Sequence, residues 1–134
     1  MPKQYLNPPE LFHSQQYGFS QIVTSHGGKT VYLSGQVAWD NMMKIVGPSD
    51  LRAQTIQTLR NIELALKSAG GSITDVVSMR IYIVKSKLVE DHHITETLKT
   101  FFPTDQLPAS TWIGVPALSN KDFLVEIEAV AVIE

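Results

Sequence analysis

The feature that most constrains the fold is the alternation of side chains in the C-terminal segment 123–133. Every second residue from Phe123 to Ile133 is apolar, which is the two-residue period of a β-strand with one face in a core. The residues between them are a mixture of aliphatic side chains with Glu126 and Glu128. A face in contact with water should be mostly charged or polar, so both faces of this strand are predicted to be covered.

The other segments predict the order β-β-α-β-α-β-β. One helix is expected after Ser49 or Asp50 and ends at Gly70-Gly71, and a second spans about 87–102 before Pro103. Helices between strands imply crossover connections with some parallel pairing, so both helices cover one face of one sheet. We therefore expect an α+β fold in a single domain over residues 1–134, with an irregular N-terminal lead-in. The predicted strands are 21–25, 30–38, 75–84, 109–115 and 123–133, and residues 26–29 are expected to join the first two as a hairpin.

The helices and the sheet are each expected to bury one row of side chains. Helical spacing predicts that Thr55, Leu59, Ile62, Leu66 and Ala69 of the first helix, and Leu88, Thr95, Leu98 and Phe102 of the second, point inward. In the middle strand the corresponding row is Val77, Met79, Ile81 and Ile83.

The opposite face of the sheet is predicted to be a subunit interface. Two helices cannot cover both faces, and a mixed apolar and polar surface is typical of contacts between subunits. The natural cover is another copy of the chain, so we expect a closed homo-oligomer. Strand alternation assigns to this face Tyr32, Ser34, Gln36, Val76, Ser78, Arg80, Tyr82, Val84, Ser110, Trp112, Gly114, Leu124, Glu126, Glu128, Val130 and Val132.

Composition excludes several kinds of site. The chain has no Cys, which removes disulfides, thiolate metal sites and iron–sulfur clusters. It has 11 Lys and Arg against 13 Asp and Glu, and because the cations are scattered no nucleic-acid surface is expected. No signal peptide or membrane span is visible, so we expect a cytoplasmic protein. The adjacent His92 and His93 point apart on a helix and cannot share a metal, and neither a metal nor a cofactor is expected.

A series of short motifs lies in order along nearly the whole chain. They are Gly18–Gln21, Tyr32–Gln36, the helix over 54–61, Ala69–Ser72, Asp75–Val77, Pro108-Ala109 and Leu124–Ala129. Together they resemble the Rid family, also known as YjgF or L-PSP endoribonuclease-like. The resemblance implies a chorismate-mutase-like fold and a homotrimer with a cleft at each interface. It also implies hydrolysis of reactive 2-imino acids, or their enamine tautomers, to 2-keto acids and ammonia without a cofactor.

The resemblance further implies which residues form the cleft. Glu126 matches the glutamate that directs water, and Ser34 and Gly35 match the strand segment that lines the cleft. Phe19 stands where the family has a tyrosine. This set fits the chemistry, because a protonated imine is already electrophilic and needs mainly a directed water and a hold on its carboxylate.

One position departs from the active branch of the family. That branch has Pro-Ala-Arg before the penultimate strand, whereas Ser110 occupies the place of the arginine here. The usual anchor for a 2-imino acid carboxylate is therefore missing, and Arg80 is the candidate to replace it. The predicted substrate-binding residues are Phe19, Ser34, Gly35, Arg80, Thr95, Ser110, Thr111 and Trp112, with Glu126 as the catalytic residue.

Each of these assignments has a structural alternative. Glu126 could instead pair with Arg80 or with a backbone amide in the interface, since such networks place charges at the same kind of position. Arg80 could form an interface salt bridge to Glu126 or to Glu128. Gly35 either gives a ligand access to the backbone or marks a β-bulge, and Trp112 lines either the cleft or an interface core. For function, the leading hypothesis is a hydrolase that deaminates imines or enamines. The alternative is a non-catalytic trimer that binds or senses a small metabolite, and nuclease activity is the weakest hypothesis.

Overall fold

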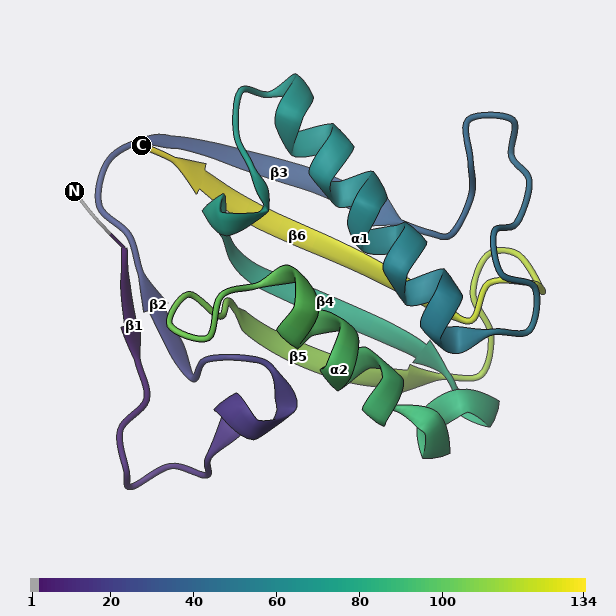
Figure 1. The fold of residues 1–134 in the computed structure, drawn as a ribbon, viewed down its shortest axis with the longest axis horizontal. Helices are drawn as coiled ribbons and strands as arrows, with labels where there is room; N and C mark the ends of the chain where they lie inside the picture. The colour runs from purple at the N-terminus through teal and green to yellow at the C-terminus, as the bar shows by residue number, and fades with distance from the viewer. Residues whose placement is uncertain (1–2) are drawn as a thin grey trace.

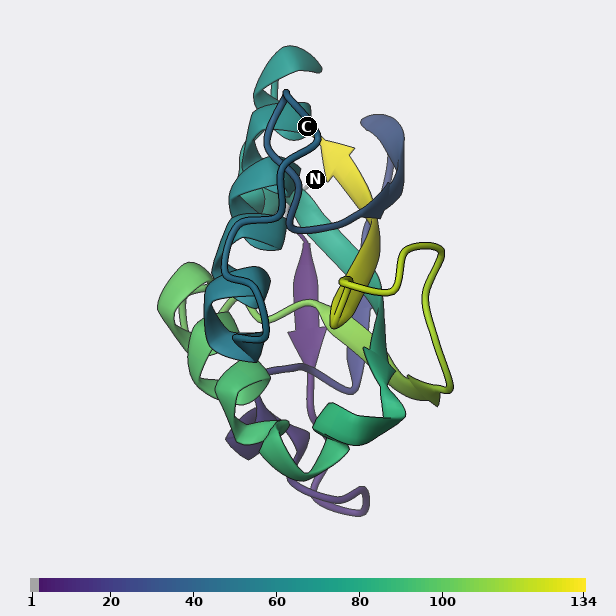
Figure 2. The ribbon, with the colours of Figure 1, turned by 90° about the vertical axis from the view of Figure 1, so that its right-hand side faces the viewer.

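The structure, a computed structural model, describes residues 3–134 and consists of a sheet with two helices packed on one face (Figures 1 and 2). The strands are β1 (Gln4–Leu6), β2 (Ile22–Thr24), β3 (Lys29–Gln36), β4 (Val76–Val84), β5 (Ala109–Val115) and β6 (Val125–Ile133), and the helices are α1 (Leu51–Ser68) and α2 (His92–Phe101). Short 3-10 helices occupy Ser14–Tyr17, Ile73–Asp75 and Lys85–Glu90. The main sheet has the order β3-β6-β4-β5, in which β4 and β5 are parallel and β6 is antiparallel to both of its neighbours. The predicted α+β class is confirmed.

The core lies between the sheet and the helices. Leu59, Ile62 and Leu66 of α1 are fully buried and pack in one cluster with Ile127 and Ala129 of β6, as the helical and strand periods predicted. Gly70 follows α1 with a φ of 91°, the left-handed conformation that commonly ends a helix. Among residues 3–134 no helix is long and apolar enough to cross a membrane.

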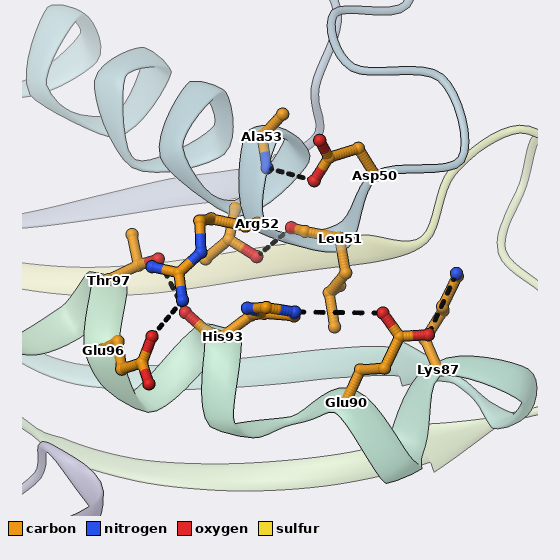
Figure 3. Close-up of polar contacts among 10 residues, drawn as sticks. Asp50, Leu51, Arg52, Ala53, Lys87, Glu90, His93, Glu96 and Thr97 are labelled. Carbon is orange, nitrogen blue, oxygen red and sulfur yellow. Dashed lines mark hydrogen bonds and ion pairs between the residues drawn. The ribbon is translucent and has the colours of Figure 1, made fainter.

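One charged pair joins the N-terminal parts of the two helices (Figure 3). Asp50 caps α1 by accepting a hydrogen bond from the Ala53 amide at 3.0 Å, as expected. Arg52 of α1 forms an ion pair with Glu96 of α2, and its hydrogen bond to that carboxyl lowers the pKa of Glu96. Because both side chains are largely exposed, this pair orients the helices more than it stabilises them.

The N-terminal strands pair differently from the prediction. Residues 4–6, expected to be irregular, form β1 and pair with β2 in a separate two-stranded sheet. Residues 26–29 therefore do not close a hairpin but lead from this small sheet into β3, which pairs with β6. Gly27 and Gly28 both have positive φ angles, 73° and 78°, which lets the chain change direction between the two sheets.

The second helix is shorter than predicted. Residues 85–90 form a 3-10 helix, and α2 begins only at His92. The side chain of Val89 is 87% exposed and that of Leu88 39% exposed, so this segment presents no apolar face that would extend α2 into the core. Leu88 instead lies over Gly114 of β5.

The face assigned to β5 was wrong by one residue. Met79 is paired with Ser110 and Ile81 with Trp112, and paired residues in a sheet point to the same side. Ser110, Trp112 and Gly114 therefore lie on the side of the helices, whereas the open face carries Thr111 and Ile113. The alternation within β5 alone is too weak to set this register.

Two irregularities produce smaller corrections of the same kind. Val76, not Val77, is the buried residue at the start of β4, because the register with β6 shifts between Val76 and Ser78. In β3 the register shifts between Leu33 and Gln36, so Gln36 pairs with Ile127 of the buried row and leaves the open face.

Candidate functional site

The open face of the sheet is mixed in character. Tyr32 is 79% exposed on it, beside Val130 of the neighbouring strand. Its charged groups come from adjacent positions of two central strands, where Arg80 pairs with Glu128 and Tyr82 with Glu126. The loop over 116–122 stands on this same side of the sheet, opposite the helices (Figure 2). The polar groups of this face are therefore concentrated on β4 and β6.

Glu126 and Gly35 are in direct contact across the bulge in β3. A Cβ on Gly35 would lie 2.9 Å from Cδ of Glu126 and closer still to its Oε2, so the carboxylate occupies the space that any other residue's side chain would need. Both sequence interpretations of Gly35 thus have a structural counterpart: the strand bulges here, and a polar group approaches the backbone closely. The glycine positions the catalytic candidate.

The environment of Glu126 favours its protonated form. Partial burial is the larger cause and the nearby charge of Glu128 the smaller, and both raise the pKa of the Glu126 carboxyl. A carboxyl with a raised pKa is a better proton acceptor from water once ionised. No hydrogen bond or salt bridge to the Glu126 carboxylate is found among the described residues.

Glu128 differs from Glu126 because it has partners. It accepts a short hydrogen bond from the Tyr82 hydroxyl and lies 3.8 Å from Nη1 of Arg80. The hydrogen bond to Glu128, with burial second, raises the pKa of Tyr82. The Arg80 side chain is 64% exposed, so its long contact with Glu128 is weak. Arg80 thus forms its ion pair with Glu128 and not with Glu126. The Glu126 carboxylate is left available to bind water or a ligand.

Two hollows meet at the Glu126 carboxylate. The larger is a shallow cleft of about 550 Å³ between the segment after β3, the outer side of α1 and the loop before β6. The smaller, about 240 Å³, lies on the open face and is lined by Tyr82, Leu118 and Glu128 as well as Gly35 and Glu126. Arg80 lines neither of these hollows but a separate one of about 90 Å³ with Ser78 and Val130.

The remaining predicted site residues gather elsewhere. The Phe19 and Trp112 rings lie 6.2 Å apart, and the Trp112 indole donates to the Ser110 hydroxyl at 3.0 Å. The Phe19 segment packs on α2, because a Cβ on the preceding Gly18 would lie 3.3 Å from the backbone oxygen of Thr95. Phe19, Thr95, Ser110 and Trp112 thus form one group on the helix side of β5.

Within one chain this aromatic group and Glu126 do not form a common site. Glu126 is on β6, which is separated from β5 by β4, and its side chain is on the opposite face from Ser110 and Trp112. Gly35 lies with Glu126, and Ser34 precedes it in the bulge of β3, whereas Arg80 and Thr111 are neighbours on the open face between the two groups. The predicted residues therefore form two separated half-sites.

Sequence reasoning missed the residues that line the larger cleft, notably Trp39, Leu64 and Ser119. For Trp39 and Ser119 the only signal was their place in long connections, which often carry functional groups. Leu64 lies on α1, and nothing in the sequence pattern marked it. Asn61 was noted only within a motif, and it is structural here. Its side-chain amide donates to the backbone oxygens of Val37 and Trp39 at 2.8 and 2.9 Å, which holds the wall of the cleft. Across the described part of the chain, no group of three or more His, Asp or Glu could hold a metal ion.

Comparison with known proteins gives consistent similarities. Residues 13–133 match the family described as Endoribonuclease L-PSP. The chain is 31% identical over 134 residues to a 2-iminobutanoate/2-iminopropanoate deaminase of Dermatophagoides farinae, covering 99% of this chain and 98% of that protein. It is similar to the crystal structure of YyfB from Yersinia pestis, a Rid family protein of unknown function, with a TM-score of 0.93, 36% identity, and 99% and 100% of the two chains covered. A crystal structure of E. coli TdcF with bound serine has a TM-score of 0.66 and 28% identity, covering 89% of this chain and 95% of that one.

Proposed function

The chain belongs to the Endoribonuclease L-PSP family, which includes the Rid and YjgF proteins, and from this premise we propose that it is a hydrolase that releases ammonia from imines or enamines of small carboxylated metabolites. The observation that carries the proposal is the Glu126 carboxylate, which is seated on Gly35, has a raised pKa, and faces two hollows. A relative named as a 2-iminobutanoate/2-iminopropanoate deaminase supports the reaction class. A relative with bound serine supports a ligand with a carboxylate and a nitrogen on adjacent carbons.

The reaction needs one directed water and no redox step. The ionised Glu126 accepts a proton from water while the water oxygen bonds to the carbon of the protonated imine, giving a tetrahedral carbinolamine. Glu126 then returns this proton to the nitrogen of the carbinolamine and is ionised again. The C–N bond breaks, the nitrogen leaves as ammonia with the bonding electron pair, and the carbon becomes the carbonyl of a 2-keto acid. The hydroxyl proton released in this step passes through Glu126 to the ammonia, which leaves as ammonium, so the carboxylate is ionised at the end of the cycle.

Two half-sites in one chain suggest a site completed by a neighbouring subunit. In this proposal the sheets of three chains pack together through their open faces, and the edge strand β5 of one chain brings the group around Trp112 and Phe19 to Glu126 of the next. The open face supports this arrangement because Tyr32 and Val130 leave it too apolar for a surface in permanent contact with water.

The substrate carboxylate must be held without an arginine at position 110. Arg80 is the candidate anchor: its pair with Glu128 is long and largely exposed, and it lies diagonally across from Glu126 on the same face. Such diagonal neighbours in a sheet are about 7–8 Å apart, within reach of a long side chain. The Thr111 hydroxyl, which is paired with Arg80 and lies on the same face, supplies a neutral donor beside it.

The test is ammonia release from 2-imino acids generated in situ by an amino-acid oxidase. We expect the wild-type chain to accelerate release, and Glu126→Gln to lower kcat by about 100-fold or more, as loss of a general base does. The matched control is Glu63→Gln, which removes a carboxylate from the exposed side of α1 and should keep full activity. Equal activity of the Glu126 variant and wild type would contradict the proposal. Binding of a 2-keto acid without any turnover would instead support the non-catalytic binding function.

A further inference from the structure

The larger cleft beside Glu126 has Trp39 as an aromatic wall, within a lining that mixes apolar and polar residues. Trp39 packs edge-on against the buried ring of Phe123, with ring centroids 4.9 Å apart and planes at 75°. The backbone on either side of Trp39 is held by Asn61, whose side-chain oxygen in turn accepts a hydrogen bond from Gln57 at 2.9 Å. The indole is therefore fixed in place before any ligand binds.

The opposite side of the cleft carries an unusual helix residue. Leu64 is 66% exposed on the outer side of α1, between the exposed Glu63 and the half-buried Ala65, and it lines the cleft. A single exposed leucine is common on protein surfaces and does not by itself indicate a binding site. Here it faces a cleft that also contains Trp39 and ends at the proposed catalytic carboxylate. An apolar group bound next to Glu126 would be enclosed by both side chains.

The charges in this cleft exclude a second carboxylate on the ligand. Its described lining includes Asp40 and Glu126 but no Lys, Arg or His. The Asp40 carboxylate accepts hydrogen bonds from the Lys44 and Met42 amides, at 3.0 and 2.8 Å, which lower the pKa of Asp40 and keep it ionised. The Asp40 carboxylate is thus bonded within its own loop. The remaining lining consists of apolar groups, among them Trp39 and Leu64, and of neutral polar residues, namely Gln36, Asn41, Asn61 and Ser119.

The size of the cleft exceeds what a small imine needs. Its volume of about 550 Å³ falls in the range that holds complete small-molecule ligands. From these observations we infer that Trp39 and Leu64 are specificity-determining residues, and that the cleft takes the side chain of a 2-imino acid that is large and uncharged, aromatic or long aliphatic. This inference rests on the proposed function, because it assumes that the reacting carbon is placed at Glu126.

Parallel measurements of activity and of binding test whether Trp39 and Leu64 determine specificity. For activity, kcat/KM is compared for 2-imino acids made in situ from phenylalanine, alanine, glutamate and lysine. We expect the phenylalanine-derived substrate to be the best of the four. Trp39→Ala and Leu64→Ala should each lower its kcat/KM relative to the alanine-derived substrate by about tenfold, the usual effect of losing part of a hydrophobic pocket. Val89→Ala, which truncates an exposed valine that does not line the cleft, is the matched control and should keep the wild-type ratio.

For binding, calorimetry compares the products phenylpyruvate, pyruvate and 2-oxoglutarate. We expect phenylpyruvate to bind tightest, and Trp39→Ala or Leu64→Ala to weaken it about tenfold. Leu64→Ala changes an exposed side chain, so it remains informative if Trp39→Ala does not fold. Loss of phenylpyruvate affinity in these variants without any turnover in wild type would support the specificity role while refuting hydrolysis. Turnover with an unchanged substrate ratio in both variants, or a preference for acidic or basic side chains, would overturn the inference and leave the proposed reaction standing.

Discussion

At the scale of single residues, Gly35 and Glu126 are in contact: the Glu126 carboxylate fills the space that a side chain at position 35 would need, and the lack of a side chain there lets the carboxylate take this position. Gly35 has no positive φ, so its backbone would accept any residue. What requires glycine is the carboxylate that lies against its α-carbon. Sequence alone could identify both residues, but not that they touch, because the contact depends on a bulge whose register only the folded sheet defines.

This contact predicts a coupling between the two positions. Gly35→Ala should displace the Glu126 carboxylate, which is the flexible end of its side chain, and should therefore reduce activity strongly. The free energy of unfolding should fall by about 1 kcal/mol or less, the low end of the range for overpacking. In a Glu126→Ala background the same change should have no further effect on activity, because the carboxylate is already gone. Ammonia release and urea unfolding of the four proteins measure these effects, and full activity of Gly35→Ala would show that the glycine does not position Glu126.

The raised pKa of Glu126 predicts the acid limb of the pH profile. Only the ionised carboxylate can accept a proton from water, so kcat/KM should fall as pH decreases through a pKa above the ordinary glutamate value. Glu128→Gln removes the neighbouring negative charge and should move this limb to lower pH, while burial, the larger cause, keeps it above the ordinary value. Glu63→Gln should leave the limb in place. A limb that does not move in Glu128→Gln would argue against Glu126 as the titrating group.

The raised pKa of Glu126 also predicts how stability depends on pH, and stability should change with pH in the opposite direction to activity. Because the folded chain holds the Glu126 proton to higher pH than the unfolded chain does, the folded state binds more protons between the ordinary and the raised pKa. The stability of wild type relative to Glu126→Gln should therefore be greatest below this window and decrease as pH rises through it. Unfolding midpoints of the two proteins across that range measure the difference.

At the scale of elements, the long helices and central strands were predictable and the edges were not. The inward rows of α1, β4 and β6 have strong periodicity, and all three lie where the sequence places them apart from the bulge at Val76. For β5, periodicity is weak and neighbouring strands set the register, so Ser110 and Trp112 were assigned to the wrong face. β1 is only three residues long, too short for any pattern to reveal.

One buried side chain connects these elements to the site. Gln54 of α1 has no exposed surface; its amide donates to the backbone oxygens of Gly47 and Asp122 at 3.2 and 3.0 Å and accepts from the Leu124 amide at 2.9 Å. The segment it holds leads directly into β6 and Glu126. A glutamine on a buried helix face is therefore a structural clamp for the strand that carries the catalytic candidate.

Gln54→Leu should accordingly be strongly destabilising. It leaves buried backbone groups without partners, and we expect the free energy of unfolding to fall by about 2–5 kcal/mol. Gln57→Leu, one turn further along, loses a single side-chain bond to Asn61 and should cost only about 0.5–1.5 kcal/mol. Chemical denaturation compares the two. Similar small effects would mean that Gln54 does not anchor the entry to β6.

At the scale of the whole molecule, the open sheet face links fold to function. The sequence predicted that a second face would need covering, and in the single chain that face indeed remains open (Figure 2). The sequence also proposed residues for one site, and the fold separates these candidates into the Glu126 group and the Phe19–Trp112 group. No pattern within one chain could show which groups meet across an interface. The proposal that copies of the chain complete each other's sites therefore follows from geometry.

Subunit mixing tests this account most directly. Glu126→Gln disables one half-site, and Phe19→Asp disables the other by placing a negative charge beside Trp112, where a carboxylated substrate would be repelled. Each variant should form a trimer by light scattering and be inactive by itself. Unfolding and refolding the two together in equal amounts should restore about a quarter of wild-type ammonia release, because one interface in four joins two intact halves. A mixture that stays inactive, although its subunits have exchanged, would show that the site does not form between chains and would contradict the account.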